Sequence, residues 1–281
     1  MRVDLCGVRG STPAPGADFG GVGGHTSCVA LSNHDSGRDV RPTLLLDGGT
    51  GLRNVAGLLG GAPFEGSLLL GHLHWDHTQG LPFFAAGDRD DARVDVHLPV
   101  LDGPPERALD GLMGPPFFPI SPERLRGRWT FHALEEGSLD VEGFTVVVRE
   151  IPHPGGRTFG FRVSDGERSL AYLSDHGPIE LGAGPDGWGP YHEAALALVD
   201  GVDLLLHDAQ FTADELAARP HFGHSCVDYA VELARRCVVG RLLLYHHDPS
   251  RTDDQVDALV AGCAGRGVDV AAAREGASLT L

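Results

Sequence analysis

The sequence predicts an α/β protein in which helices cover the β-sheets, and three observations support this prediction. Short apolar runs alternate with turn-rich segments and with patterns of helical period along the chain. Several runs are apolar without interruption, as in residues 44–46 and 204–206, which is typical of strands covered on both faces. The chain has 281 residues and no evident domain boundary, so residues 1–281 are expected to form a single domain.

The expected strands are short apolar segments bounded by turn residues. In chain order they are 3–8, 26–31, 43–47, 67–71, 94–100, 145–151, 159–164, 169–174, 203–207 and 241–246, followed by short strands at 268–272 and 277–281. The uninterrupted leucine runs within 43–47, 67–71, 203–207 and 241–246 predict that these strands are buried most completely.

The expected helices are the segments near 50–59, 105–112, 190–200, 212–218, 225–238 and 253–265. In the segment 225–238, the residues Cys226, Ala230, Leu233 and Cys237 follow the 4-3-4 spacing of one helix face. The least regular stretch is 101–128, which is rich in proline. Because its apolar side chains would be costly to expose to water, we interpret it as a packed loop of defined conformation or as a cap, and not as a linker.

The composition excludes some functional classes. Lys and Arg number 22 against 39 Asp and Glu, a net charge of −17, which argues against bulk nucleic acid as the main partner. The start of the chain lacks a signal-peptide apolar region, and no run reaches the ~18 apolar residues of a membrane span. The five cysteines show no CxxC spacing, so no disulfide framework or Cys-rich zinc site is implied. We therefore expect a cytoplasmic protein without a membrane partner.

Histidine is the informative residue type. The chain has 15 His, and His is the commonest metal ligand. Five apolar strands run directly into residues that can bind metal, namely His72, His153, Asp175, the pair His207-Asp208 and the pair His246-His247. Because functional groups in α/β sheets gather at strand ends, we expect these side chains to converge on one site.

The strongest single feature is the motif HLHWDH at residues 72–77. In an extended segment alternate side chains point the same way, so His72 and His74 can bind one metal ion. A turn after Trp75 can then direct Asp76 and His77 toward a neighbouring ion. Neutral imidazole suits Zn²⁺ and carboxylates suit harder ions such as Mn²⁺, so Zn²⁺ is favoured and Mn²⁺ is the alternative.

With His153, Asp175 and His246 downstream, this HxHxDH motif resembles that of the metallo-β-lactamase fold. The segments 7–13 and 23–28 resemble the opening of its RNase Z-like and phosphoribosyl cyclic phosphodiesterase-like branch. The resemblance continues through the segments 46–51, 153–156, 207–211, 223–225 and 246–249. It departs at His25, where relatives commonly have Asn.

The resemblance implies an αββα sandwich of two mixed β-sheets flanked by helices, with two metal ions at one edge. It assigns His72, His74 and His153 to one ion, Asp76, His77 and His246 to the other, and Asp175 to a bridging position. His246 is preferred over His247 because the family's apolar strand closes directly on its ligand. Asp47 is expected to support the ligand turn by hydrogen bonding, the alternative being an ordinary turn residue.

The two implied metals indicate hydrolysis. At a separation of ~3.5–4 Å, two ions bridge a water and lower its pKa toward ~7, which provides hydroxide at neutral pH. Asp76 is expected to be catalytic as a ligand that also contacts this hydroxide. His207 is expected to donate a proton to the leaving group, with Asp208 orienting or charging it. The role of Asp208 stays open, because RNase Z proteins have Glu at this position.

The leading hypothesis is a phosphodiesterase that acts on a small nucleotide-like or cyclic phosphate. Asp175, a carboxylate where common zinc β-lactamases have a thiolate, fits hydrolysis of phosphodiesters, thioesters or lactones. The alternatives are a lactone or acyl hydrolase, then a tRNA 3′-end endonuclease, then a non-catalytic biosynthetic accessory protein. The charge of −17 and the lack of a long Gly- and Lys-rich arm oppose the nuclease, and the complete ligand set opposes the accessory protein. The expected partners are a phosphate-containing small molecule and, by the resemblance, a second copy in a homodimer.

The remaining histidines carry weaker signals. His25, His176 and His221 are candidates for the substrate pocket. His224 opens a helix beside Ser225, and both a structural role and a pocket role are open. The others are expected at surface or satisfied polar positions, and they are His34, His97, His132 and His192.

Overall fold

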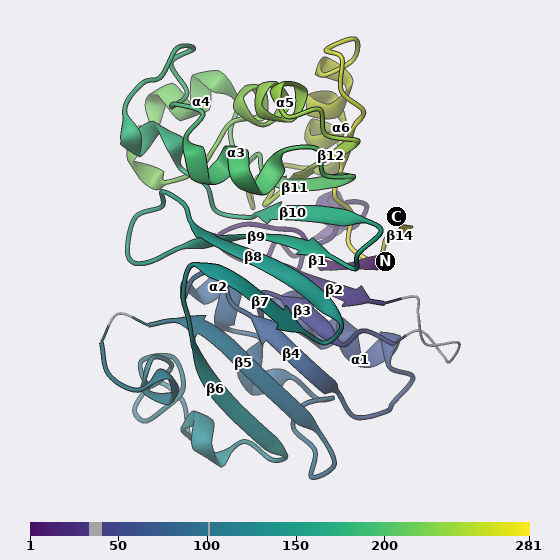
Figure 1. Ribbon diagram of the computed structural model, residues 1–281, viewed down its shortest axis with the longest axis vertical. Helices are drawn as coiled ribbons and strands as arrows, with labels where there is room; N and C mark the ends of the chain where they lie inside the picture. The colour runs from purple at the N-terminus through teal and green to yellow at the C-terminus, as the bar shows by residue number, and fades with distance from the viewer. Residues whose placement is uncertain (34–40, 101) are drawn as a thin grey trace.

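Two β-sheets packed face to face form the centre of the computed structural model, which describes residues 1–33, 41–100 and 102–281 (Figure 1). Within these residues each sheet has seven strands, and helices lie on the outer faces of the pair (Figure 1). The predicted αββα sandwich of two mixed sheets is therefore confirmed. His34 lies outside the described residues.

The first sheet contains the N-terminal strands and the C-terminal strand. Its members are β1 (Arg2–Gly7), β2 (Cys28–Ser32), β3 (Leu44–Leu46), β4 (Glu65–Leu69), β5 (Arg93–Pro99), β6 (Arg128–Leu134) and β14 (Ser278–Thr280). Their order is β14-β1-β2-β3-β4-β5-β6. The strands from β14 to β3 pair antiparallel, whereas β3 to β6 are parallel. The parallel strands β3 and β4 thus end at the same edge, immediately before Asp47 and the HLHWDH motif.

The second sheet has the order β13-β12-β11-β10-β9-β8-β7. Its members are β7 (Gly137–Val141), β8 (Phe144–Glu150), β9 (Phe159–Ser164), β10 (Ser169–Leu173), β11 (Leu204–Asp208), β12 (Arg241–Tyr245) and β13 (Val270–Ala272). The strands β7 to β10 are antiparallel, and β10 to β13 are parallel. Three parallel strands, β10, β11 and β12, therefore present their carboxyl ends side by side.

Helices cover the outer faces of both sheets. Those of the described residues are α1 (Val55–Leu58), α2 (Trp75–Thr78), α3 (Glu193–Val199), α4 (Ala213–Ala218), α5 (Val227–Arg236) and α6 (Asp253–Gly262). The leucine run of β11 shows the layering: Leu204 and Leu206 pack between the sheets, whereas Leu205 packs in the core under the helices. This strand is covered on both faces, as its uninterrupted apolar sequence predicts.

Every segment expected to be a strand contains one, but β6 and β7 were not expected. The signal for β6 was present, because Trp129 and Phe131 alternate with polar residues. The helix expected near 105–112 is wrong, since only the 3₁₀ turn Pro105–Arg107 forms there among the described residues. Gly111 and the prolines at 115 and 116 follow closely, and they leave too little chain for a stable helix.

None of the helices in the described part of the chain combines the length and the apolar character needed to cross a bilayer. All five cysteines are free and buried, in agreement with a chain that has no disulfide framework.

Candidate metal centre

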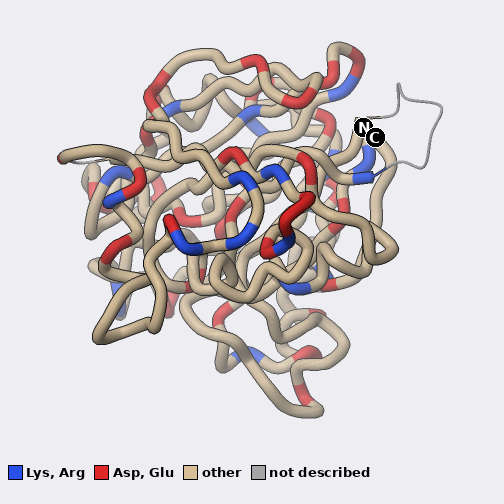
Figure 2. The backbone as a smooth tube through the Cα atoms, turned by 90° about the horizontal axis from the view of Figure 1, so that it is seen from below, with Lys and Arg blue, Asp and Glu red and all other residues tan. Residues whose placement is uncertain are grey.

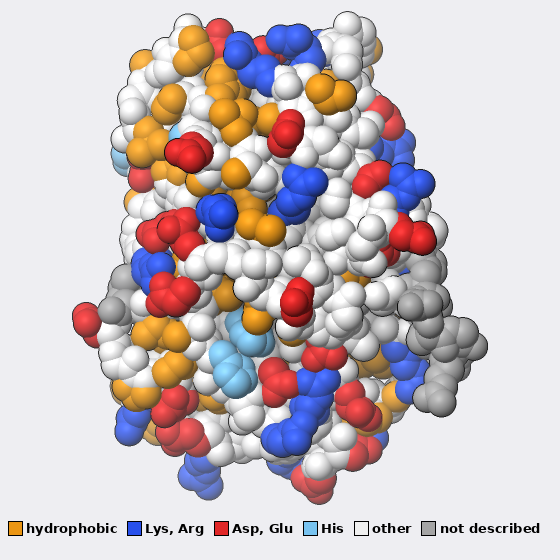
Figure 3. All heavy atoms as spheres, in the orientation of Figure 1, with side chains coloured by type: hydrophobic (Ala, Val, Ile, Leu, Met, Phe, Trp, Pro, Cys, Tyr) orange, Lys and Arg blue, Asp and Glu red, His pale blue; other side chains and the backbone are white. Residues whose placement is uncertain are grey.

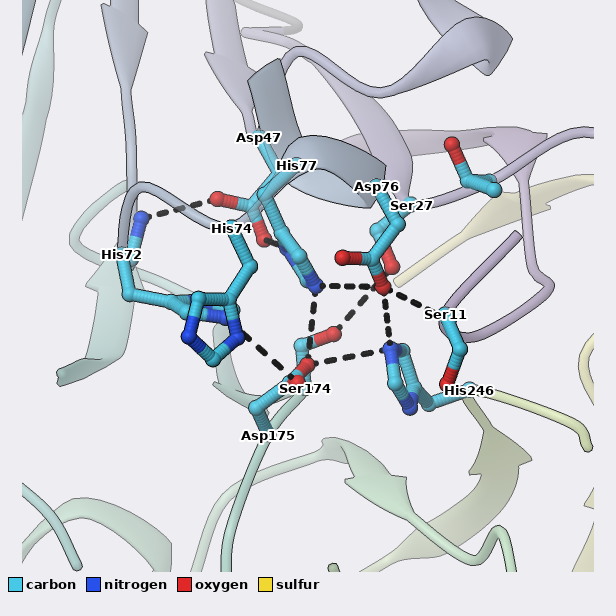
Figure 4. Close-up of polar contacts among 12 residues, drawn as sticks. Ser11, Ser27, Asp47, His72, His74, Asp76, His77, Ser174, Asp175 and His246 are labelled. Carbon is cyan, nitrogen blue, oxygen red and sulfur yellow. Dashed lines mark hydrogen bonds and ion pairs between the residues drawn. The ribbon is translucent and has the colours of Figure 1, made fainter. Parts of the chain in front are cut away.

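The carboxyl ends of strands from both sheets meet at one edge of the sandwich, and the residues predicted to bind metal lie there (Figure 4). The strands β4, β8, β10 and β12 are followed by His72, His153, Asp175 and His246, and α2 carries Asp76 and His77. His74 lies immediately before α2 and is half-buried, whereas the other six side chains are buried. Segments far apart in the sequence thus supply one compact cluster.

The side chains form two groups that share one carboxylate. The ligand-type atoms within each group lie within 4.8 Å of one another, and the groups are His72, His74, His153 and Asp175, and Asp76, His77, Asp175 and His246. The structure therefore brings together all the predicted ligands in the two sets that the resemblance implies, with Asp175 common to both. Binding of metal by these residues stays a prediction.

Several atoms of the cluster are buried and make no hydrogen bond within the described protein. They include Nε2 of His72, Nε2 of His77 and Oδ1 of Asp175. Nε2 of His77 lies only 2.9 Å from Oδ1 of Asp175, so these atoms are close without the alignment of a hydrogen bond. Buried polar groups are nearly always hydrogen-bonded. Ligand-type nitrogen and oxygen atoms that lie close together without hydrogen bonds are the arrangement that a bound cation requires. Imidazoles and carboxylates in this number fit divalent metal ions.

Burial favours the protonation state that imidazole ligands need. It lowers the pKa of His72 well below its ordinary value, with a further contribution from His77. Burial also lowers the pKa values of His74 and His153. Because a neutral imidazole has a free lone pair for a metal, these three side chains are in their binding form at neutral pH.

The second group holds more negative charge. Burial raises the pKa of Asp175, but the neighbouring His246 and His77 more than offset this and hold it well below its ordinary value. The pKa of Asp76 is lowered in the same way, against the effect of burial, by His77 and His246. Burial lowers the pKa of His77, yet Asp175, Asp76 and Asp47 raise it well above its ordinary value. Bound cations would balance the negative charge of the Asp76 and Asp175 carboxylates.

Asp47 supports the second group by hydrogen bonds. Its Oδ2 accepts from Nδ1 of His77 at 2.7 Å and from the hydroxyl of Tyr172 at 2.7 Å, and its Oδ1 accepts from the N–H of Gly71 at 2.8 Å. These contacts fix the ring of His77 with Nε2 toward Asp175. The supporting position expected for Asp47 is the one that the structure shows.

Backbone groups orient two further side chains. Nδ1 of His153 donates to the carbonyl oxygen of Gly223 at 2.7 Å, which leaves Nε2 facing the cluster. The N–H of Ser11 donates to Oδ2 of Asp76 at 2.7 Å. Ser11 has a φ of 62°, which is uncommon for a residue with a Cβ and is found where surrounding structure imposes it. The loop at 9–13 is therefore held against the cluster.

The structure distinguishes the adjacent histidines 246 and 247. Nε2 of His246 lies 3.1 Å from Oδ2 of Asp76 and 3.1 Å from Oδ1 of Asp175, so this ring belongs to the cluster. His247 points elsewhere, with Nε2 3.0 Å from the carbonyl oxygen of Ala273. The ring of His246 also packs so closely on Gly10 that a Cβ there would lie 2.5 Å from it.

His207 does not face the metal cluster. Its Nδ1 donates to the backbone carbonyl of Asp208 at 2.7 Å, and its Nε2 lies 2.9 Å from Nδ1 of His176, whose Nε2 is 2.7 Å from Nε2 of His192. Successive residues of a strand point to opposite faces, so the side chains of His207 and Asp208 diverge in β11. The expected orientation of His207 by the Asp208 carboxylate is therefore wrong, and this geometry does not favour the predicted proton-donor role.

The Asp208 carboxylate instead holds His224. Nδ1 of His224 donates to Oδ2 of Asp208 at 2.9 Å and lies 3.9 Å from Oδ2 of Asp175. Burial lowers the pKa of His224, but Asp208 and then Asp175 more than offset this and raise it to about 9. His224 shares a hollow of about 390 Å³ with Asp76 and Asp175. Of its two open roles, the structure shows the pocket position.

The remaining histidines of the described residues lie outside the metal cluster, at separate places in the fold. His176 is buried beside His207, and His221 is exposed against Phe222. His25 lines two hollows, of about 510 and 680 Å³. His97 and His132 stack across β5 and β6 with ring centroids 4.8 Å apart. Histidine side chains lie next to one another on the face of the molecule shown in Figure 3.

Comparison with known proteins identifies relatives. Residues 52–247 match the family model of the beta-lactamase superfamily domain. The chain is 29% identical to Ribonuclease Z of Geobacillus kaustophilus over 223 residues, which covers 64% of this chain and 69% of that protein. Among the first curated relatives, the matches span between 18% and 69% of the relative's length.

Two solved structures align over nearly the whole chain. The metallo-beta-lactamase fold protein YhfI from Bacillus subtilis has a TM-score of 0.71 and 18% identity, with 99% of both chains covered. A diphosphatase from the PhnP family has a TM-score of 0.67 and 18% identity, with 100% of this chain and 97% of that chain covered. At such identities these two structures establish the fold alone.

A two-sheet sandwich with clustered His and Asp side chains at one edge defines the class of metallo-β-lactamase fold hydrolases. Because the family model covers more than half of the chain, this chain belongs to the beta-lactamase superfamily. The family predicted from the HxHxDH motif is confirmed. The matched relative Ribonuclease Z is a hydrolase, which agrees with the predicted enzyme class.

Proposed function

We propose that this protein is a phosphodiesterase that uses two divalent metal ions, Zn²⁺ in preference to Mn²⁺, to hydrolyse a small nucleotide-like or cyclic phosphate. One observation carries the proposal: two groups of ligand-type side chains share Asp175 and contain buried atoms without hydrogen bonds. Seven converging ligands are more than one tetrahedral ion can use.

The residues present fit two metal ions. One ion would be held by His72, His74 and His153, the other by Asp76, His77 and His246, with Asp175 shared. When bound, the ions supply Lewis acidity toward phosphate oxygens and lower the pKa of water toward ~7. The imidazole nitrogens of the two groups suit Zn²⁺, and the carboxylates of Asp76 and Asp175 also accept Mn²⁺.

Two side chains of the protein can orient the attacking water and protonate the leaving oxygen. Asp76, fixed by the N–H of Ser11, offers a carboxylate oxygen that can orient the attacking water. His224, fixed by Asp208, carries a proton that it can give to the leaving oxygen. Expelling an alkoxide needs such a proton, and general acid help of this kind contributes ~10²–10⁴-fold in rate.

The hollow at the cluster suits a small substrate. Its volume is about 390 Å³, and Trp75 and Leu73 line it beside the polar residues. The Trp75 side chain is 75% exposed, so its ring is available to stack on a planar group such as a nucleobase.

Charge supports a small partner over bulk nucleic acid. Acidic and basic positions are interspersed along the backbone in the view of Figure 2, and Arg126 of the cluster at 124–128 is paired with Asp88. A chain of net charge −17 would bind tRNA weakly, because each phosphate contact needs a cation. We also propose a cytoplasmic location, which the five free cysteines suit, and a homodimer, which the resemblance favours.

Metal analysis followed by a substrate panel tests the proposal. The panel consists of bis-p-nitrophenyl phosphate, cyclic nucleotides, a lactone and nitrocefin. We expect hydrolysis of the phosphodiesters and its loss in Asp76→Ala, while Asp140→Ala, which removes an exposed carboxylate from β7, keeps wild-type rates. Hydrolysis of the lactone alone would replace the phosphodiesterase by an acyl hydrolase. An Asp76→Ala variant that keeps more than about a tenth of the wild-type rate would contradict the assigned role of Asp76.

A further inference from the structure

A second hollow, of about 510 Å³, is lined in part by Gln79 and Gly80, which directly follow α2. The residues that line it are Pro13, His25, Thr50, Arg53, Gln79, Gly80, Phe83 and Ala85. None of these described residues is Asp or Glu, although the chain carries a net charge of −17. The lining instead offers the guanidinium of Arg53 and the amide of Gln79, which can donate hydrogen bonds to an anion.

Two segments of chain connect this hollow to the one at the metal centre. The helix α2 carries Asp76 at the first hollow, and Gln79 follows it at the second. These residues are three apart, a rise of about 4.5 Å along a helix. On the loop at 9–13, Ser11 lines the first hollow and Pro13 lines the second, and two residues of chain separate them by at most about 7 Å. The lining residues of the two hollows are therefore neighbours along both segments of chain.

Arg53 supplies the positive charge of the second hollow. It lies on the 3₁₀ helix Thr50–Asn54, which follows the Asp47 turn. Its side chain is exposed and forms no ion pair with any carboxylate in the described part of the chain. A guanidinium that no carboxylate occupies can bind a phosphate through two parallel hydrogen bonds.

The carboxylate of Glu275 contacts His25 but is not among the residues that line this hollow. Its Oε1 lies 4.0 Å from Nε2 of the His25 ring. Its two oxygens accept hydrogen bonds from the Asn54 side chain at 3.0 Å and from the N–H of His25 at 2.9 Å. The other ring nitrogen of His25 is 3.1 Å from the Thr50 hydroxyl, so the ring is fixed between the carboxylate and the hollow.

Each of the two hollows has one exposed aromatic ring in its lining. Phe83 lines the second hollow with 68% of its side chain exposed, and Trp75 lines the first with 75% exposed. Phe83 packs edge-on against Phe118, with ring centroids 5.8 Å apart, which limits the positions that it can adopt. Phe83, an exposed ring, lines the same hollow as the guanidinium of Arg53. This combination suits a ligand that has both a planar group and an anionic group.

We propose that this hollow, the Arg53 subsite, binds a second phosphate group of the substrate whose phosphodiester lies at the metal centre. The substrate class is then a nucleoside phosphodiester that carries a further phosphate, with its planar base against the exposed rings. This inference rests on the proposed phosphodiesterase function, and it adds which phosphodiesters the enzyme prefers.

Two chromogenic esters test the subsite. One is thymidine 5′-(p-nitrophenyl phosphate), and the other is the same ester with a 3′-phosphate. For the zinc-loaded wild type we expect the 3′-phosphate to raise kcat/KM about tenfold. Arg53→Gln should abolish this advantage and leave the rate on the plain ester within about twofold of wild type. The matched control is Arg128→Gln, which changes an exposed arginine at the start of β6, on the opposite edge of the sheet, and should keep the advantage.

Direct binding separates failure of the subsite from failure of the proposed function. Calorimetric titration with thymidine 3′,5′-bisphosphate and thymidine 5′-monophosphate should show about tenfold tighter binding of the bisphosphate, lost in Arg53→Gln and retained in Arg128→Gln. If neither ester is hydrolysed but this pattern of affinities holds, the phosphodiesterase proposal fails and the subsite stands. Equal affinities for the two nucleotides in the wild type, or a bisphosphate preference that survives Arg53→Gln, would overturn the subsite.

Discussion

Replacing His224 by glutamine tests the proton donor that the geometry assigns. Glutamine can still donate a hydrogen bond to Asp208, but it carries no titratable proton. In the wild type, Nδ1 of His224 lies 2.9 Å from Oδ2 of Asp208, and the pKa of His224 is raised to about 9 against the opposing effect of burial. The Asp208 carboxylate beside the ring favours the protonated form of His224 at neutral pH, so the acid is available when the leaving oxygen needs it.

The expected loss depends on the leaving group. On a ribose-type phosphodiester, His224→Gln should lower kcat by ~10²–10⁴-fold, the usual contribution of a general acid. On bis-p-nitrophenyl phosphate the loss should be less than about tenfold, because p-nitrophenolate is a stable anion that leaves without a proton. The matched control is His221→Gln, which changes an exposed histidine three residues earlier in the chain and should lower neither rate.

The competing assignment is His207, and the same assay decides between the two. His207→Gln removes a buried imidazole that bonds to the Asp208 carbonyl and to His176. We expect it to destabilise the fold by about 1–3 kcal/mol and to lower both rates by the same factor. If His224→Gln lowers both rates equally and His207→Gln lowers only the rate on the ribose ester, the assignment of His224 is refuted.

Three further predictions concern the metals, the packing at the site and the partners. Elemental analysis of metal-replete protein should give close to two divalent ions per chain, as the two groups that share Asp175 require, and a result of one ion or none would contradict this. Gly10→Ala places a Cβ 2.5 Å from the His246 ring, so it should lower metal content and activity, whereas Gly57→Ala, where a Cβ meets nothing within 4 Å, should change neither. Mobility-shift assays at physiological salt should show no stable complex with precursor tRNA, and a tight, salt-sensitive complex cleaved at its 3′ end would favour the nuclease.

The metal centre could be predicted from the sequence because short sequence patterns mark its ligands. The HLHWDH motif places four ligand-type side chains within six residues, and each remaining ligand directly follows an apolar strand. The choice between His246 and His247 needed the structure. The preceding run Leu242–Leu244 is uniformly apolar, so the period-2 pattern that would tell one face of the strand from the other is absent.

The same lack of alternation explains the misplaced His207. Leu204, Leu205 and Leu206 carry no polar residue to mark a face, so the sequence does not reveal which of His207 and Asp208 points toward the metals. In the structure, packing determines which residues of the strand point to which face: Leu206 faces the other sheet, and Leu205 faces the helices. Because alternate residues share a face, Asp208 follows Leu206 toward the site and His207 follows Leu205 under the helices.

The hollows could not be predicted, because each is assembled from segments that only the tertiary fold brings together. Ser11, Asp76 and His224 meet at the first hollow, and Pro13, Arg53 and Phe83 meet at the second. The ligands follow regular strands of the two sheets, whereas the residues proposed to select the substrate lie on loops, short helical turns and helix ends. Loops vary without disturbing the sheets that carry the ligands. Substrate choice can therefore change among proteins of this fold while the metal chemistry stays the same, which is why the Arg53 subsite and not the HxHxDH motif is the part of this chain that should distinguish its substrate.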